Sequence, residues 1–355
     1  MPTARNYRLH ELDALRGLAA MMVVICHCTL LNQGFTFKYG GVGVDLFFII
    51  SGFVIFMTLN TVKTGREFII KRFARLYPVY WVCLTLTMIL MVCELYFRNN
   101  TLPQPELWID YAAGLTMLQR FVGRNDLDGP YWSLAVELVF YMLIFLTYKL
   151  RLLKYAVPIF MVLATLQFGA QLLLHLLPRT GFVSDLYSFE SSVLFPHFIS
   201  LFLAGIVFYR MYNGNKTVLN YLLIALCLIM QCFEHEGRHI EMFDMVPWEY
   251  NMMLSLFFSL FILFINGKLR FIVNPATLFL GRISYALYLF HQYLLIRFLI
   301  PFLNIDLKLS YLFSCIIAIT IIVAIATVNT FFIDEPLRKR ITAALLKKES
   351  PEISS

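Results

Sequence analysis

Charged side chains are scarce in this sequence: Asp, Glu, Lys and Arg fill 14% of its 355 positions, while hydrophobic residues fill 60%. A soluble domain is about half apolar and about a quarter charged. A chain with so few charges cannot cover itself with polar surface. The shortage of charge therefore excludes a water-soluble fold and predicts an integral membrane protein.

Patterns for disulfides, metals and extra domains are also missing. The seven cysteines lie mainly within or at the ends of apolar runs, which favours small buried side chains over a disulfide framework. Cys26, His27 and Cys28 are adjacent and point about 100° apart on a helix, so they cannot close on one metal ion. No internal repeat, low-complexity segment or long linker is visible. The first apolar run lacks a small-residue cleavage site, so we expect a span rather than a signal peptide.

Apolar runs of about 20 residues, the length that crosses a bilayer, recur along the chain. The run 107–122 is shorter and more polar, and we expect an interfacial or re-entrant helix there. The pattern predicts an all-α polytopic bundle, with a membrane domain over 1–340 and a short basic and polar cytoplasmic tail over 341–355. The ten predicted spans are roughly 12–31, 43–62, 77–97, 130–149, 154–177, 193–212, 217–233, 248–266, 276–299 and 309–333.

The positive charge follows the predicted topology. A net charge of +7 could suggest a nucleic-acid partner, but Lys and Arg sit in short clusters between the apolar runs. Most of them fall in alternate connecting segments, beginning with the N-terminus, as the positive-inside rule requires. The distribution predicts that both ends are cytoplasmic, and it favours topology determinants over a phosphate-binding surface.

Ionisable residues inside spans mark functional sites by default. Arg16 and His27 are eleven positions apart in the first span, about 20° beyond three full helical turns, so they share a face and lie about 16 Å apart along the axis. Arg16 is near the cytoplasmic side and His27 is in the outer half. This spacing suits one elongated ligand or a single polar channel; a buried hydrogen bond made by His27 is the structural alternative.

Three further ionisable residues, Asp45, Glu137 and His291, are expected at a similar outer depth in other spans. Ser133 shares a face with Glu137 at i, i+4. If the bundle brings these helices together, two histidines and two carboxylates form a set able to do general acid–base chemistry. Each also fits a structural role, as a paired carboxylate, an interfacial histidine or a helix-packing serine.

The segment KRFARLYP places Lys71, Arg72 and Arg75 before the third span. Arg72 and Arg75 are three apart, so on a helical turn they present neighbouring guanidiniums suited to phosphate. Basic residues also flank spans for topology alone, and the spacing leaves both interpretations open. Further along, DEPLRKR at 334–340 is a basic segment that ends the last predicted span. Its Glu335 could pair with the basic loop that contains Arg72 and Arg75.

Six stretches resemble the acyltransferase family 3 of integral membrane proteins: LDALRGLAAMMVVICH, GGVGVDLFFIISGFVI, KRFARLYPVYW, YWSLAVELVFY, GRISYALYLFHQ and FFIDEPLRKR. Each is weak alone, but six in the family's order, over residues 9 to about 340, are specific. The resemblance implies a ten-helix domain that transfers an acyl group, usually acetyl, from cytoplasmic acyl-CoA to a hydroxyl of a glycan or lipid-linked sugar. It implies a bacterial plasma (inner) membrane location and a stand-alone transferase without an appended extracytoplasmic hydrolase-like domain.

Carried over to matching positions, the resemblance makes Arg16 and His27 the essential first-helix pair. His27 would accept the proton of the sugar hydroxyl, or would carry the acyl group briefly as an acyl-imidazole. Arg16 would steady the donor arm. Arg72 and Arg75 match a basic pair proposed to meet the CoA phosphates, with Lys71 beside them.

The remaining positions have less settled roles in the family. Asp45 or Glu137 would hold the tautomer of His27, and His291 falls in a recurring motif. The residues expected at a sugar-binding mouth are Tyr131, Trp132 and Ser133, although the two aromatic residues also suit an interfacial belt.

Two other classes remain open. Ten spans with intramembrane His, Asp and Glu also describe a proton-coupled transporter of a small polar solute or glycan, although the repeat halves and broken helices usual in carriers are not clear here. A structural or sensory protein would explain the spans but not the charges. Turnover of labelled acetyl-CoA, against uptake without CoA turnover, separates the first two classes. The acceptor sugar, the acyl group and the oligomeric state are left open.

Overall fold

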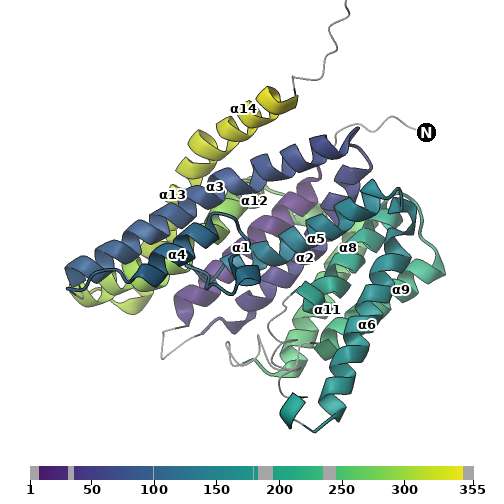
Figure 1. Ribbon diagram of the computed structural model, residues 1–355, viewed down its shortest axis with the longest axis horizontal. Coiled ribbons are helices and arrows are strands. Elements are labelled where there is room, and N and C mark those ends of the chain that lie inside the picture. Colours follow the sequence, from purple (N-terminus) through teal and green to yellow (C-terminus); the bar gives the residue numbers. More distant parts are fainter. Residues whose placement is uncertain are drawn as a thin grey trace, which may run out of the picture. The chain divides into compact units, whose positions relative to one another are not determined.

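The fold is built from helices. The computed structural model describes residues 8–30, 36–98, 100–178, 180–182, 195–234 and 245–346, and within these ranges it has no strand (Figure 1). Because the bilayer core offers no water to backbone N–H and C=O groups, helices that bond internally satisfy them. The longer helices are α1 (His10–Thr29), α2 (Gly43–Leu59), α3 (Gly65–Cys93), α4 (Pro105–Gly114), α5 (Tyr131–Lys149), α6 (Ala156–Leu176), α8 (Ile199–Tyr212), α9 (Val218–Glu234), α11 (Pro247–Ile265), α12 (Pro275–Phe290), α13 (Tyr311–Val328) and α14 (Glu335–Leu346).

The helix lengths confirm a polytopic membrane protein. In the described part of the chain, seven helices are long and apolar enough to cross a membrane, and the bent pair Pro275–Phe290 and Tyr293–Asp306 makes an eighth if it is one span. Two shorter apolar helices, α8 and α9, occupy the sixth and seventh predicted spans, and the start of predicted span 193–212 lies outside the described residues. The count of ten spans and the cytoplasmic ends stay predictions.

The helix that contains the third predicted span begins about three turns before that span. One helix runs from Gly65 to Phe97, so the basic segment before Pro78 is part of it and Pro78 lies in its interior. Hydropathy finds only the apolar half. The polar half is helical because the Thr64 hydroxyl accepts the Glu67 N–H (3.1 Å) and Glu67 pairs with Lys71 one turn later (2.5 Å).

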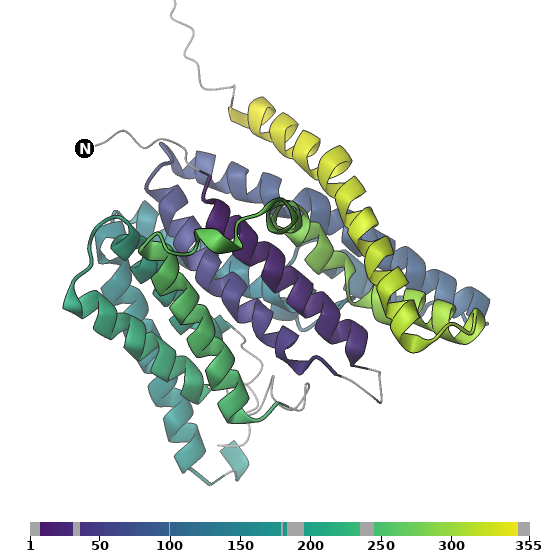
Figure 2. The ribbon, with the colours of Figure 1, turned by 180° about the vertical axis from the view of Figure 1, so that it is seen from behind.

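The helix that contains the last predicted span is also longer than the apolar run. Helix continues from Tyr311 to Leu346 through the short segment η9 (Asn329–Asp334), and it is the yellow-green to yellow run in Figure 2. The first residues of the predicted tail, 341–346, are therefore helical, and 347–355 lie outside the described residues.

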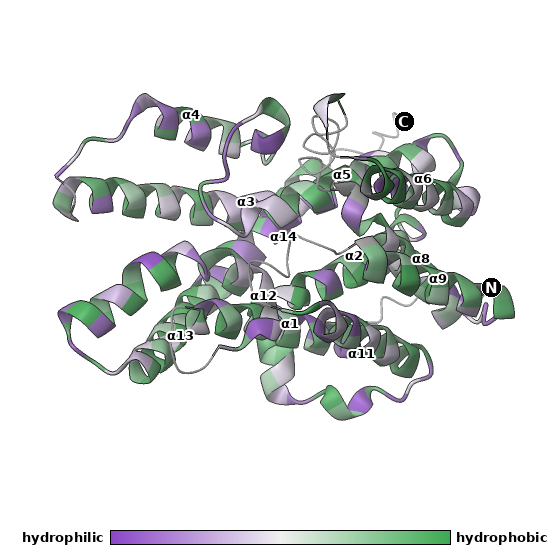
Figure 3. Cartoon of the chain, turned by 90° about the horizontal axis from the view of Figure 1, so that it is seen from below, coloured by the Kyte–Doolittle hydropathy of each residue, from purple (hydrophilic) through white to green (hydrophobic). Residues whose placement is uncertain are grey.

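The run 107–122 folds as the ten-residue helix α4 and a short turn, η3 (Gln119–Val122). At 1.5 Å per residue α4 is about 15 Å long, too short for a hydrocarbon core of about 30 Å. It carries hydrophilic as well as hydrophobic residues (Figure 3). Three side chains of α3 bond the carbonyls at its end: Tyr77 to Thr116 (3.0 Å), Tyr80 to Gly114 (2.7 Å) and Trp81 to Leu115 (2.9 Å).

The chain divides into two compact units. The first comprises Met1–Val23, Lys38–Thr61 and Val136–Leu278, and the second comprises Val24–Phe37, Val62–Ala135 and Phe279–Ser355. In the first unit α2 and α8 touch backbone to backbone. A Cβ at Gly52 would lie 2.2 Å from the carbonyl oxygen of Phe202, and one at Gly205 would lie 2.2 Å from that of Ile49. Small residues permit this close packing of membrane helices.

In the second unit α12 is tied to its neighbours by polar contacts. Arg282 binds both oxygens of Glu335 at 2.6 Å and lies over the Phe331 ring (4.0 Å), while the Tyr285 hydroxyl donates to the Leu76 carbonyl (2.9 Å). The expectation that Glu335 pairs with the basic loop is thus wrong. The apolar run 276–299 is not one straight helix either, because its two halves bend by 60°.

Candidate active site

Two of the predicted catalytic residues meet in the second unit. His27 lies near the end of α1, and His291 lies in the break that follows α12. Their ring centroids are 4.7 Å apart, with the rings edge to face at 72°. Both side chains are buried. The end of α1 is held by α13, where the Tyr311 hydroxyl donates to the carbonyl of Cys28 (2.8 Å).

The hydrogen bond of His291 fixes which ring nitrogen is basic. Its Nδ1 is 2.5 Å from the carbonyl oxygen of Tyr288, and because a carbonyl only accepts, Nδ1 carries the proton. Nε2 is left with a lone pair. The side chain is 1% exposed, and Nε2 has no hydrogen-bond partner among the described residues. Buried polar atoms are normally paired, so this nitrogen is a candidate acceptor of a proton or hydrogen bond.

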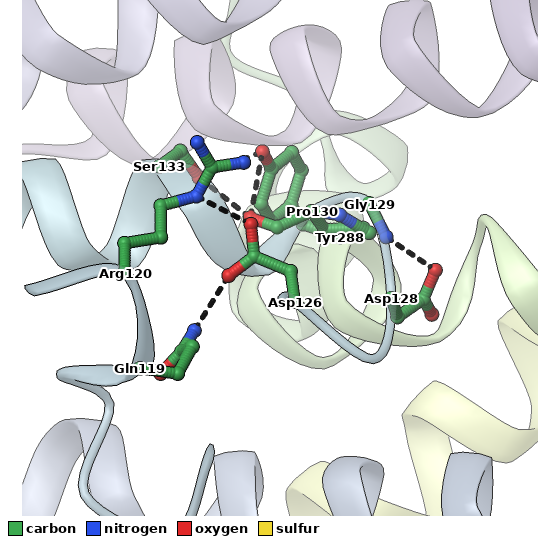
Figure 4. Close-up of polar contacts among 8 residues, drawn as sticks. All are labelled: Gln119, Arg120, Asp126, Asp128, Gly129, Pro130, Ser133 and Tyr288. Carbon is green, nitrogen blue, oxygen red and sulfur yellow. Dashed lines mark hydrogen bonds and ion pairs between the residues drawn. The ribbon is translucent and has the colours of Figure 1, made fainter. Parts of the chain in front are cut away.

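Residues 128–133 contact the chain on both sides of this break, at Tyr288 and at Tyr293, and Figure 4 shows the contacts at Tyr288. Ser133 donates its hydroxyl proton to the Pro130 carbonyl (2.9 Å), and the Tyr288 hydroxyl also donates to that carbonyl (3.4 Å). The two hydroxyl oxygens lie 2.8 Å apart. The Ser133 hydroxyl is therefore engaged by protein groups on both sides. Its predicted role in substrate binding stays a prediction.

Asp128 is a buried residue of the site that the sequence did not single out. Its Oδ1 accepts the N–H of Gly129 (2.8 Å) and of Tyr293 (3.1 Å), the residue that begins the short helix η7 (Tyr293–Leu299) after the break. The Tyr293 hydroxyl donates to Glu94 (2.5 Å). Burial raises the pKa of the Asp128 carboxyl to about 7, although the two N–H bonds lower it. The sequence signal that could have identified Asp128 is an acidic residue directly before Gly-Pro at the start of a predicted span.

The other predicted catalytic residues belong to the first unit. Asp45 is 1% exposed; Tyr250 donates to its Oδ2 (2.9 Å), and its Oδ1 has no hydrogen-bond partner in the described ranges. Glu137 accepts from Ser51 (2.6 Å) and from the Tyr141 hydroxyl one turn along α5. Arg16 is half-buried on the first part of α1. Their approach to the two histidines stays a prediction.

The predicted donor-binding residues lie along the polar half of α3, against which α14 packs. Lys71 is already paired with Glu67 (2.5 Å), and the Arg72 guanidinium lies 5.7 Å from the Phe68 ring centroid. Arg75 is close enough to Asp334 for electrostatic interaction, as is Arg338 of α14. The positive region therefore includes a residue of the C-terminal helix.

The two aromatic residues expected at a sugar-binding mouth differ in burial. Tyr131 is fully enclosed, with its ring on Tyr80 (5.1 Å) and its hydroxyl 3.2 Å from Thr87, whereas Trp132 is half-buried. Of this pair, only Trp132 has exposed surface to offer a ligand. Among the described residues no group of three His, Cys, Asp or Glu side chains is placed to hold a metal ion.

Comparison with known proteins identifies the class. A family model described as an acyltransferase domain matches residues 9–328, nearly the whole chain. The chain therefore belongs to acyltransferase family 3, and it is a membrane O-acyltransferase. This membership decides between the open classes in favour of an enzyme over a transporter.

Proteins similar to this chain are named as acyltransferases or acetyltransferases. The chain is 25% identical to the predicted acetyltransferase ORF330 of Acidianus two-tailed virus, over 78% of this chain and 80% of that protein. It is 26% identical to the O-acetyltransferase OatA of Staphylococcus aureus (strain NCTC 8325 / PS 47), over 94% of this chain and 57% of that protein. Acyltransferase MdmB of Streptomyces mycarofaciens is 27% identical over 41% of each chain. No solved structure gives a significant match.

Proposed function

We propose that this enzyme moves an acyl group, acetyl in the simplest case, from cytoplasmic acyl-CoA to a hydroxyl of a glycan or lipid-linked sugar at the outer side of a bacterial inner membrane. The names of two relatives as acetyltransferases support acetyl as the group transferred. The distribution of Lys and Arg supports a cytoplasmic donor side.

The observation that carries the proposal is the buried pair of His27 and His291 at the break in a membrane helix. In the proposed reaction a neutral His27 takes the proton of the acceptor hydroxyl. The hydroxyl oxygen then attacks the thioester carbon, the ester C–O bond forms and the C–S bond breaks. CoA leaves as a thiolate and takes up the proton. The ring of His291, in contact with that of His27, stabilises the imidazolium through its free Nε2.

The proposed binding of acyl-CoA depends on the positively charged residues of α3 and α14. Arg72 and Arg75, joined by Arg338, are suited to the phosphates of CoA because guanidinium groups bind phosphate oxygens in pairs. Arg16, on the same helix as His27, is placed to steady the acyl arm. The alternative in which His27 carries the acyl group as an acyl-imidazole uses the same residues.

The test compares two histidines of one helix. We expect His27→Ala to lower transfer of radiolabelled acetyl from acetyl-CoA by about 100-fold or more, since general bases contribute about 10²- to 10⁴-fold. His10→Ala, exposed at the start of α1, is the matched control and should stay active. Full activity of inserted, folded His27→Ala would remove His27 from the mechanism. Mass spectrometry of surface glycans, with and without the protein, identifies the acceptor.

A further inference from the structure

The break between α12 and η7 is held from outside by one short segment. Residues 128–133 contact the bent chain before, at and after the bend; Figure 4 shows the first of these contacts, at Tyr288. Before it, the Tyr288 hydroxyl lies 2.8 Å from the Ser133 hydroxyl and donates to the Pro130 carbonyl (3.4 Å). After it, the N–H of Tyr293 donates to Asp128 (3.1 Å).

At the bend itself, Gly129 lets the segment come close. A Cβ on Gly129 would lie 2.0 Å from the amide oxygen of Gln292, so any larger residue would push the Gln292 side chain away. Gln292 follows His291 directly. The contact between Gly129 and Gln292 therefore lies one residue from the imidazole.

A broken helix in a membrane leaves backbone groups without partners, and in hydrocarbon these must be satisfied by other groups. Here the carbonyl of Tyr288 is bonded by His291 and the N–H of Tyr293 by Asp128. The first of these bonds sets the tautomer of His291. The second fixes where the chain resumes after it.

We propose that residues 128–133 form a clamp that positions His291, and that Asp128 is its principal positioning residue. This inference rests on the proposed function, in which His291 supports the base. Asp128 touches no reacting atom. It acts by holding the bend, so that the Nε2 of His291 stays aimed and buried.

The experiment uses the full-length protein, purified in nanodiscs, and three variants. Asp128→Ala removes the acceptor of the Tyr293 N–H, whereas Asp128→Asn keeps an oxygen that can accept it. Asp110→Asn is the matched control, because Asp110 lies on α4, before the same loop, and its side chain pairs with Arg124 (2.7 Å). Two readouts are taken: acetyl-CoA turnover, and the rate at which diethyl pyrocarbonate modifies His291, followed by mass spectrometry.

We expect Asp128→Ala to lower kcat by about 10- to 100-fold, because a misplacement of about 1 Å has effects of that size. The KM for acetyl-CoA should change less than about twofold, since a positioning group acts on the reacting geometry and not on donor binding. His291 should react severalfold faster with the reagent, since it is no longer held in its buried position. Asp128→Asn should restore both values towards wild type, and Asp110→Asn should resemble wild type in both.

Unchanged kcat and unchanged His291 reactivity in folded Asp128→Ala would overturn the clamp. If the wild-type protein turns over no acyl-CoA, the proposed function fails, and the modification rates alone then decide whether residues 128–133 hold His291. If Asp128→Ala does not fold, Gly129→Ala replaces it, because it leaves Asp128 in place and displaces Gln292. Unchanged modification of His291 in that variant would equally overturn the inference.

Discussion

Asp128 should make the stability of this enzyme depend on pH in a predictable direction. Its pKa rises from 3.8 to about 7 on folding because burial disfavours the charged carboxylate. Between about pH 4 and pH 7 the folded chain keeps a proton that the unfolded chain has lost. Stability therefore falls as the pH rises through this window, and it is level above and below it.

The size of the effect follows from the shift. A shift of about three pKa units corresponds to about 4 kcal/mol, at about 1.4 kcal/mol per unit. Asp128→Asn removes the titration but keeps an oxygen for the two N–H donors. Relative to wild type, the variant should therefore gain stability steadily from pH 4 to pH 7.

The assay is thermal unfolding of both proteins in detergent, at half-unit steps from pH 4.5 to pH 8. Every other titrating group is common to the two chains, so the difference between the curves isolates Asp128. We expect the melting temperature of Asp128→Asn minus that of wild type to grow by several degrees, at roughly 2–4 °C per kcal/mol. A difference that stays constant across the range would refute the burial argument.

Three further variants test the helix packing, an ion pair and a buried carboxyl group. Gly52→Ala should destabilise the protein by about 1–3 kcal/mol, because the added Cβ meets the α8 backbone. Gly169→Ala on α6 is the control, because a Cβ added there meets no atom within 4 Å. Equal melting temperatures of the two variants would contradict the α2–α8 contact. Glu335→Gln should lose about 1 kcal/mol, since the ion pair it breaks is bidentate but partly exposed; an unchanged melting temperature would count against a stabilising pair. Tyr250→Phe removes the hydroxyl that donates to Asp45 and should cost about 1–3 kcal/mol. Wild-type stability of the variant in the same measurement would mean that Asp45 finds another donor.

The meeting of His27 and His291 illustrates what the sequence can predict. Both residues interrupt apolar runs, and the position of each along its run can be counted from the ends of the run. The structure places their rings together in one unit. Hydropathy and helical periodicity give the position of each histidine along its helix, because both properties are local, whereas the contact between the two rings comes from tertiary packing.

The break after α12 illustrates what the sequence does not reveal. The run 276–299 contains no Gly or Pro near His291, so hydropathy reads it as one helix. The bend is held by contacts with residues 128–133, which are remote in the chain. Asp128 escaped notice for the same reason, because it stands in a connecting loop and its burial depends on tertiary packing.

The sequence did not predict the ion-pair partner of Glu335. Glu335 was expected to meet the basic loop near Arg72, since both carry complementary charge near the same side. It instead binds Arg282, which lies inside a predicted span. Sequence spacing gives the phase of a helix but not the helix that packs beside it.

The most direct test of the central claim is a transfer measurement in sealed membrane vesicles of known orientation. Labelled acetyl-CoA is supplied only to the cytoplasmic face, and the acceptor glycan is present only at the opposite face. We predict labelled ester on the glycan with wild-type protein and none with His27→Ala. Label that appears only when donor and acceptor share a face, or label undiminished by His27→Ala, would contradict the account.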